Sequence, residues 1–498
     1  MWNISELLNK LNIDPTRLHD LLVYNPHAPM IFSSGIFLWL FAAFILFYLL
    51  LQRRTTARLM FVTLFSYYFY YKSSGAYFFL LAIVTVSDFF IARLMARATV
   101  QWQRKMWVAA SLAINLGLLC YFKYTNFLCD FFASLTGGTF TAMDIFLPVG
   151  ISFFTFQSLS YTIDVYRKEI TPLTNLLDYA FYVSFFPQLV AGPIVRARDF
   201  IPQIRRPLFV SREMFGRGIF LIVSGLFKKA VISDYISINF VERIFDNPTL
   251  YSGVENLMGV YGYALQIYCD FSGYSDMAIG IALLLGFHFN INFDSPYKSA
   301  SITEFWRRWH ISLGGWFRDY LYIPLGGNRV KPIRHVFNIL VVWAATGFWH
   351  GASWNFVLWG LLYAVLLLFE KYILHPKRRL AVFMHIYTML FVVLGFVLFD
   401  SASIADAFMS FKSLFGLAGI PTANTASLYY LKSNLVLLSV AAVGATPLPK
   451  RIYEKIGETA GGSRVLAVLT PAATVASIAV CTAYLIDGSF NPFVYFRF

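Results

Sequence analysis

The sequence predicts an all-α polytopic membrane protein, and three observations lead to this fold class. Hydrophobic residues make up 58% of the 498 residues, charged residues only 13%, and the mean hydropathy is +0.61. A soluble domain cannot bury that much apolar surface. The net charge of +14 does not predict a nucleic-acid partner, because the Lys and Arg residues lie between apolar runs and form no single basic face. Membrane lipids are therefore the expected surroundings.

We expect about 11 transmembrane helices plus one or two re-entrant segments, since a helix needs about 20 apolar residues to cross a bilayer. The longest window without Asp, Glu, Lys or Arg is 336–369. The other such windows are 31–51, 106–122, 145–163, 179–195, 277–293, 380–399 and 465–486. Shorter apolar pieces lie at 59–71, 73–87, 218–227, 256–269 and 433–449.

The domain prediction is an N-terminal extracytoplasmic extension over residues 1–30 and one transmembrane domain over 31–498, with a catalytic core at about 145–375. The extension mixes polar and apolar residues and predicts no cleavable signal peptide. Arg53, Arg54 and Arg58 follow the first apolar run. They predict a cytoplasmic loop and an N-terminus outside the cytoplasm. Later basic clusters fit the same topology at 93–105, 196–206 and 377–379.

No motif predicts a metal or a resident cofactor. The four cysteines, Cys120, Cys129, Cys269 and Cys481, lack metal-ligand spacing. The chain also lacks a phosphate-binding loop and a dinucleotide-binding fingerprint.

Polar groups gather between residues 255 and 360, and such groups are functional candidates inside a bilayer. Asp270 and Asp276 lie between two apolar windows and need partners or water there. A polar break in a helix is the alternative explanation.

Residues 301–329 combine aromatic and basic side chains. If the first part is one helix, Thr303 can cap it, Glu304 reaches Arg308, and Trp309 and Trp316 share a face. Anchoring at the membrane surface explains the tryptophans, but it explains the adjoining His310 less well.

His350 lies near the middle of the longest apolar window, between Gly347 and Gly351. Two glycines beside one histidine indicate a bent or closely packed backbone that presents an imidazole. Seven of the eleven tryptophans lie within residues 306–359. They suggest the walls of a buried chamber. They are Trp306, Trp309, Trp316, Trp343, Trp349, Trp354 and Trp359.

Seven strings of the sequence match a known family: Gly150–Gln157, Phe185–Pro193, Asp270–Met277, Phe305–His310, Phe317–Arg329, Trp349–Ala352 and Asn491–Phe498. Together these strings resemble the membrane-bound O-acyltransferase superfamily. The resemblance is strongest to the bacterial branch of alginate and peptidoglycan O-acetyltransferases and teichoic-acid D-alanyl transfer proteins. It implies a ring of helices around a thin floor pierced by a tunnel, with the acyl donor entering from the cytoplasm and the acceptor from outside.

The resemblance implies acyl transfer in which His350 is the essential catalytic histidine and His310 the second one. We expect His350 to act as general base, because imidazole has a pKa of ~6.5. We expect His310 to orient the acyl group or donate to the oxyanion. The lower-ranked donor-binding or tunnel-lining candidates are Trp309, Trp349, Arg307, Arg308, Arg329, Asn355, Ser353 and Asp270.

Among those candidates, Ser353 and Asn355 are expected to fix the tautomer of His350. The three arginines are expected to bind donor phosphates. Membrane topology is the competing explanation for the arginines.

The expected enzyme is a multi-pass O-acetyltransferase of the bacterial cytoplasmic membrane that serves an exopolysaccharide or the cell wall. Acetyl-coenzyme A is the expected donor, with an acyl carrier protein as the alternative. The resemblance also implies an extracytoplasmic partner with a Ser-His-Asp triad, of the SGNH type. Two other classes stay open: a transporter without chemistry, and a haem protein with His310 and His350 as axial ligands.

Overall fold

The computed structural model describes residues 15–376 and 380–487, and the regular elements within them are all helices. The predicted all-α class is confirmed. The chain forms two compact units. The first comprises Met1–Thr125, Met143–Ser211 and Leu285–His288, and the second Asn126–Ala142, Arg212–Leu284 and Phe289–Phe498. Residues 1–14 of the predicted extension, the basic cluster at 377–379 and the ending Asn491–Phe498 lie outside the described residues.

The first unit holds the N-terminal helices. They are α2 (Pro15–Leu22), α3 (Gly35–Leu50), α4 (Thr55–Ser74), η1 (Gly75–Tyr77), α5 (Phe78–Arg97), α6 (Gln101–Leu119), η2 (Cys120–Tyr124), α8 (Ile151–Tyr166), α9 (Leu176–Ser184), α10 (Phe186–Leu189) and α11 (Ala197–Ile204).

Two contacts in the first unit bear on its topology. The Lys72 ammonium donates to the Leu21 carbonyl at 2.8 Å, and the Met30 N–H donates to the Lys72 carbonyl at 3.0 Å, so the described end of the extension is fixed to α4. The buried Arg58 guanidinium donates to the Arg206 carbonyl at 3.3 Å. Two of the predicted basic clusters therefore meet at one end of this unit, as a shared side of the membrane requires.

The second unit holds both candidate histidines. Its helices are α7 (Thr125–Leu135), α12 (Arg212–Leu226), η3 (Phe227–Ser233), α13 (Asp234–Ile236), η4 (Ser237–Val241), α14 (Glu242–Asp246), η5 (Pro248–Leu250), α15 (Gly253–Leu284), η6 (Pro296–Lys298), α16 (Ile302–Arg308), α17 (Ile311–Phe317), η7 (Arg318–Tyr322), α18 (Pro332–His350), α19 (Trp354–Phe369), η8 (Glu370–Leu374), α20 (Ala381–Asp400), α21 (Ile404–Leu414), α22 (Thr425–Gly444), α23 (Leu448–Gly457) and α24 (Ala460–Asp487).

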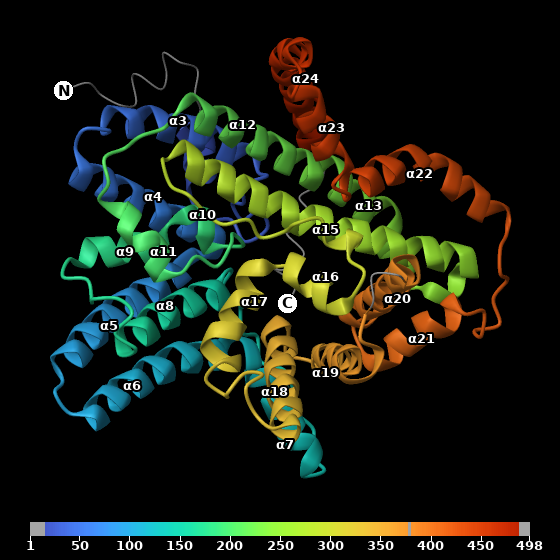
Figure 1. Cartoon of the computed structure of the whole chain (residues 1–498), viewed down its shortest axis with the longest axis horizontal. Coiled ribbons are helices and arrows are strands. Elements are labelled where there is room, and N and C mark those ends of the chain that lie inside the picture. The colour runs from blue at the N-terminus through green and yellow to red at the C-terminus, as the bar shows by residue number, and fades with distance from the viewer. Residues whose placement is uncertain (1–14, 377–379, 488–498) are drawn as a thin grey trace. The chain divides into compact units, whose positions relative to one another are not determined.

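Helix α15 is the longest of these, and it runs beside α12 at glycine contacts (Figure 1). A Cβ on Gly225 would lie 2.4 Å from the Gly273 carbonyl oxygen, and one on Gly280 would lie 2.6 Å from the Gly218 carbonyl oxygen. Small residues permit such close approach of helices in membranes. The suggested helix break around Asp270 is wrong, because α15 continues unbroken through this position.

The longest apolar window is not one helix but a hairpin of α18 and α19. Helix α18 ends at His350, and α19 begins at Trp354. The two helices touch at glycines: a Cβ on Gly347 would lie 2.1 Å from the Phe356 carbonyl oxygen, and one on Gly360 would lie 2.2 Å from the Trp343 carbonyl oxygen. The closely packed backbone predicted beside His350 is confirmed.

Six helical segments in the described part of the chain are long and apolar enough to cross a membrane. This number agrees with a multi-pass protein, while a total of about 11 spans and a ring around a tunnel stay predictions. The six segments are Thr55–Arg97, Gln101–Leu135, Trp354–Leu374, Ala381–Asp400, Thr425–Gly444 and Ala460–Ile486.

Candidate active site

His310 lies at a break between two short helices, α16 and α17. Its backbone is left-handed, with φ 44° and ψ 55°, a conformation that interrupts a right-handed helix. The expectation that Trp309 and Trp316 share a face of one helix is therefore wrong. Both indoles are buried, with 3% and 8% exposure, so they pack within the second unit and do not act as surface anchors.

The start of α16 is capped by Ser301, not by Thr303 as the sequence suggested. The Ser301 hydroxyl accepts the Glu304 N–H at 3.0 Å. Thr303 lies one residue inside the helix, and its hydroxyl donates to Glu370 at 2.6 Å. The predicted pair of Glu304 and Arg308 is confirmed at 2.9 Å. Together the cap and the carboxylates stabilise the N-terminal end of α16.

The Ser301→Ala substitution is expected to lower the free energy of unfolding by about 1 kcal/mol, because it removes the acceptor for an amide of the first turn. Ser353 is a matched control, since it occupies the N-cap position of α19 without a side-chain hydrogen bond to that helix. Ser353→Ala should change the stability by a few tenths of a kcal/mol at most. Denaturant titration in detergent micelles measures both variants, and equal losses would contradict the assignment of the cap.

Asn292 holds the imidazole of His310. The His310 Nδ1 lies 3.2 Å from the Asn292 Oδ1, and the Ser312 N–H donates to the same oxygen at 3.2 Å. The Asn292 amide nitrogen donates to the Ser275 hydroxyl at 3.1 Å. These contacts identify Oδ1 as the acceptor, so Nδ1 carries the hydrogen and Nε2 carries the lone pair. The Phe271 ring covers the imidazole edge to face at 4.6 Å.

This tautomer changes the expected role of His310. The residue lies outside the six apolar segments, and its burial lowers the pKa of the imidazole to about 3, so the ring is neutral at pH 7. A neutral ring that donates through Nδ1 presents an acceptor at Nε2. His310 is therefore arranged to accept a hydrogen bond, and the suggested donation to an oxyanion does not fit this arrangement.

His350 ends α18 and lies among aromatic rings. It is 4% exposed. Its ring meets Trp359 at 5.0 Å and Phe399 at 5.3 Å, both edge to face. Trp349 contacts both histidines, at 4.9 Å from His350 and 6.2 Å from His310. The structure therefore brings the two predicted histidines into contact with one indole.

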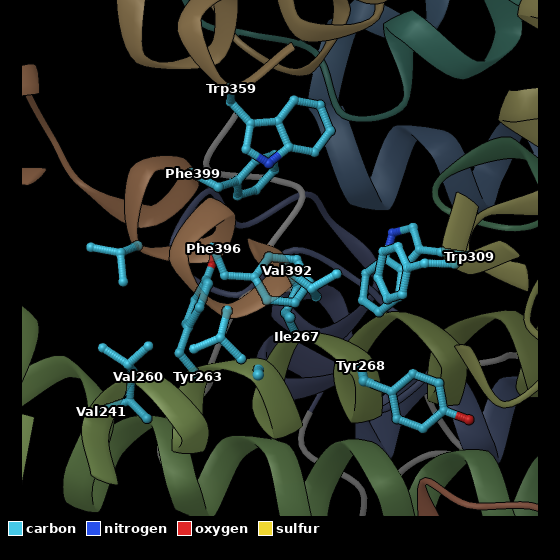
Figure 2. Packing of buried hydrophobic residues seen from close by; sticks show 14 of the residues in the cluster. Val241, Val260, Tyr263, Ile267, Tyr268, Trp309, Trp359, Val392, Phe396 and Phe399 are labelled. Carbon is cyan, nitrogen blue, oxygen red and sulfur yellow. The ribbon is translucent and has the colours of Figure 1, made fainter. Parts of the chain in front are cut away.

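The predicted chamber walls are aromatic side chains of the second unit. Trp306 packs on Trp343, Trp359 and Tyr363, with ring centroids 4.8–5.4 Å apart. Figure 2 shows Trp359 beside Phe399, with Trp309 and Phe396 in the same buried cluster. Of the seven tryptophans, Trp354 is the clear exception, since it is 49% exposed.

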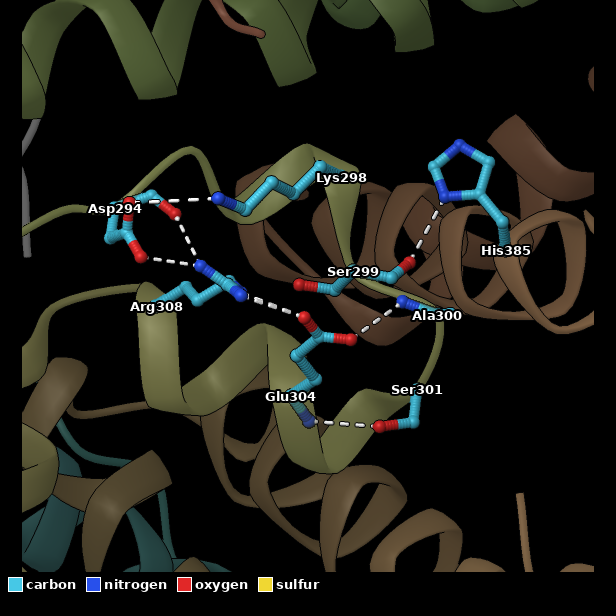
Figure 3. Close-up of polar contacts among 8 residues, drawn as sticks. All are labelled: Asp294, Lys298, Ser299, Ala300, Ser301, Glu304, Arg308 and His385. Atoms are coloured by element: carbon cyan, nitrogen blue, oxygen red, sulfur yellow. Dashed lines mark hydrogen bonds and ion pairs between the residues drawn. The ribbon is translucent and has the colours of Figure 1, made fainter. Parts of the chain in front are cut away.

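The three predicted arginines lie in different surroundings. Arg308 pairs with Glu304 at 2.9 Å and with Asp294, next to Lys298 (Figure 3). Arg307 and Arg329 are exposed. Because two carboxylates already neutralise Arg308, the structure favours a structural role for this residue. Nearby, His385 donates through Nδ1 to the Ser299 carbonyl at 3.0 Å.

Asp270 is fully buried and paired with the buried Lys229 at 2.8 Å, so the expected partner exists. Asp276 pairs with Lys228 at 2.6 Å. Asn355 donates to the Ser401 carbonyl and not to His350. Ser353 and Asn355 lie at the start of α19, and the role of Ser353 in fixing the tautomer of His350 stays a prediction.

Sequence reasoning missed Asn292 and Lys229. No pattern in the printed sequence singles out Asn292, which lies in a loop 18 positions before His310. Adjacent Lys228 and Lys229 in an otherwise apolar stretch were a usable signal, since buried cations need carboxylate partners.

Comparison with known proteins gives the family. The model of the membrane-bound O-acyltransferase family matches residues 165–405, which include both histidines. The probable alginate O-acetylase AlgI of Azotobacter vinelandii is 34% identical over 453 residues, covering 84% of this chain and 90% of the relative. This chain belongs to the membrane-bound O-acyltransferase family. It is therefore an O-acyltransferase and a multi-pass membrane protein.

Other members of this O-acyltransferase family are also similar. The peptidoglycan O-acetyltransferase of Helicobacter pylori is 36% identical over 366 residues, covering 67% of this chain and 69% of the relative. The teichoic acid D-alanyltransferase of Bacillus subtilis is 30% identical over 275 residues, covering 51% and 68%. The predicted family and its bacterial branch are confirmed.

Proposed function

We propose that this O-acyltransferase moves an acetyl group from a cytoplasmic thioester to a hydroxyl, for O-acetylation of an extracytoplasmic polysaccharide. The observation that carries the proposal is the contact of two buried imidazoles with the same indole, that of Trp349. The alginate and peptidoglycan O-acetyltransferases among the relatives support an acetyl group and a polysaccharide. The bacterial cytoplasmic membrane is the proposed location.

His350 acts as general base in this proposal. Its imidazole takes the proton of the acceptor hydroxyl while the hydroxyl oxygen attacks the thioester carbonyl carbon. The C–O bond forms, and the carbonyl electron pair moves to the oxygen. When the intermediate collapses, the C–S bond breaks and the thiolate takes the proton from the imidazolium. The products are an ester and a free thiol. General base catalysis contributes about 10²- to 10⁴-fold to such a step.

His310 orients the acceptor in this proposal. Its Nε2 lone pair, fixed by the contact of Nδ1 with Asn292, can accept a hydrogen bond from a hydroxyl. This role replaces donation to the oxyanion. The burial of the two histidines, at 2% and 4% exposure, favours transfer in a low-dielectric site where such contacts are strong.

Acetyl-coenzyme A is the proposed donor and an acetylated acyl carrier protein the alternative. An SGNH-type extracytoplasmic protein with a Ser-His-Asp triad is the proposed partner that completes transfer to the polysaccharide. The family assignment favours this chemistry over the transporter and the haem protein.

The test is thioester cleavage by purified protein in detergent, with acetyl-coenzyme A or acetylated carrier protein and an alginate oligosaccharide. His350→Gln should lower kcat by about 10²- to 10⁴-fold. His385→Gln is the matched control, because His385 bonds a backbone carbonyl in the same unit away from the aromatic cluster. It should keep kcat within a few fold.

Two results would overturn the proposal. Wild-type kcat in His350→Gln would remove the general base, and failure of the wild type to cleave either thioester would remove the proposed donors. Cleavage of one thioester and not the other identifies the donor.

A further inference from the structure

The indole N–H of Trp359 is a buried donor beside the proposed base. Trp359 is 2% exposed, and its Nε1 has no hydrogen-bond acceptor among the described residues. Leaving such a donor unsatisfied costs about 1–3 kcal/mol. Phenylalanine would fill an aromatic position without this cost. The indole at position 359 therefore calls for an explanation beyond packing.

The position of Trp359 relative to His350 explains why an indole N–H is present. The two ring centroids are 5.0 Å apart, and the planes are nearly perpendicular, at 78°. Trp343, Tyr363 and Phe399 pack around the same indole, which fixes its orientation. A preorganised donor in a dry site is what a developing negative charge requires.

Two other buried donors whose rings contact Trp359, the Trp306 Nε1 and the Tyr363 hydroxyl, have no hydrogen-bond acceptor among the described residues. Neither ring contacts His350. The Tyr363 hydroxyl lies against α20, where a Cβ on Gly395 would be 2.4 Å from its oxygen. His310 presents an acceptor at Nε2 and cannot supply the donor. Trp359 is thus a buried donor of this cluster that adjoins the proposed base; the indole of Trp349 adjoins it as well, at 4.9 Å.

We propose that the Trp359 indole N–H donates a hydrogen bond to the carbonyl oxygen of the bound acyl thioester as that oxygen becomes negative. The inference rests on the proposed function, in which His350 deprotonates the hydroxyl that attacks this carbonyl. No covalent bond forms to the indole, and its hydrogen stays on nitrogen throughout. The electron pair that the donor stabilises returns to the carbonyl bond when the thiolate leaves.

The position of Trp359 beside His350 also restricts the class of substrate group that the indole can bind. The base and the donor come from adjoining rings at the end of the α18–α19 hairpin, so both act on one small group. The hydroxyl oxygen must approach the carbonyl carbon to about 3–3.5 Å, while the carbonyl oxygen takes a hydrogen bond of 2.7–3.1 Å from the indole. The Trp359 site therefore takes the acyl carbonyl of the thioester and not the carrier that delivers it.

The test compares Trp359→Phe with Tyr363→Phe, using the thioester that the wild type cleaves. Trp359→Phe should lower kcat by about 10²- to 10³-fold, as loss of one oxyanion donor does, and leave KM within about threefold. Tyr363→Phe should keep kcat within about threefold, although it removes an equally buried donor one helical turn away. Equal losses in the two variants would show a packing effect and overturn the inference.

A second substitution separates the hydrogen bond from the shape of the ring. β-(3-benzothienyl)alanine at position 359 replaces the N–H by sulfur and keeps the size of the bicyclic ring. The fall in kcat should equal that of Trp359→Phe, with thermal unfolding unchanged. Wild-type kcat would overturn the inference. If His350→Gln also keeps wild-type kcat, the proposed function itself fails; if it does not, only the role of Trp359 fails.

Discussion

Replacing Lys229 by methionine is expected to lower the free energy of unfolding by about 3–5 kcal/mol, the usual result of breaking a buried ion pair. Lys229 and Asp270 are 1% and 0% exposed, and their charged atoms lie 2.8 Å apart. Without the ammonium, the Asp270 carboxylate stays buried and loses this cation. Denaturant titration in detergent micelles measures the loss.

The neighbouring residue provides the control. Lys228 pairs with Asp276 at 2.6 Å, but these side chains are 26% and 25% exposed, so Lys228→Met should cost about 1 kcal/mol or less. Adding Asp270→Asn to Lys229→Met should recover part of the stability, since the fully buried carboxylate is then gone while Asp234, which also pairs with Lys229 at 2.6 Å, keeps its charge. Equal losses for the two lysine variants, or no recovery in the double variant, would contradict this assignment.

The substitution Gly347→Ala is expected to abolish most of the activity and to cost about 3 kcal/mol or more. The new methyl group would lie 2.1 Å from the Phe356 carbonyl oxygen and 3.3 Å from the Gly360 Cα. These are backbone atoms, so the strain of overpacking forces α18 and α19 apart. His350 follows three residues later on α18, and a misplacement of about 1 Å can reduce a rate by about 10²-fold.

Gly216→Ala is the matched control for this prediction. Gly216 is also a helical glycine, but a Cβ there meets no atom within 4 Å. Its substitution should leave activity unchanged and raise stability by about 0.5–1 kcal/mol, because alanine loses less conformational entropy in a helix. If Gly347→Ala retains wild-type activity and stability, the glycine contact does not position His350.

The sequence predicted the close packing beside His350 better than the helix boundaries around His310. The glycines flanking His350 indicated close packing, and the contact of Gly347 with Gly360 is such packing. The segment containing His310 read as one amphipathic helix, because helical periodicity does not reveal a single left-handed residue. The predicted cap of this helix was Thr303, but the structure has Ser301. The sequence pattern locates a helix boundary only to within a few residues, because the boundary depends on backbone geometry.

Composition, apolar windows and local motifs by themselves determined the helical membrane class, the family, and the two histidines as candidates. These properties depend on residues close together in the chain. The tertiary structure decided which side chains meet across long separations: Lys229 with Asp270, Asn292 with His310, and Trp359 with His350. Hydrogen-bond partners, tautomers and ring contacts depend on how helices pack, and packing is a property of the folded chain that no single segment carries.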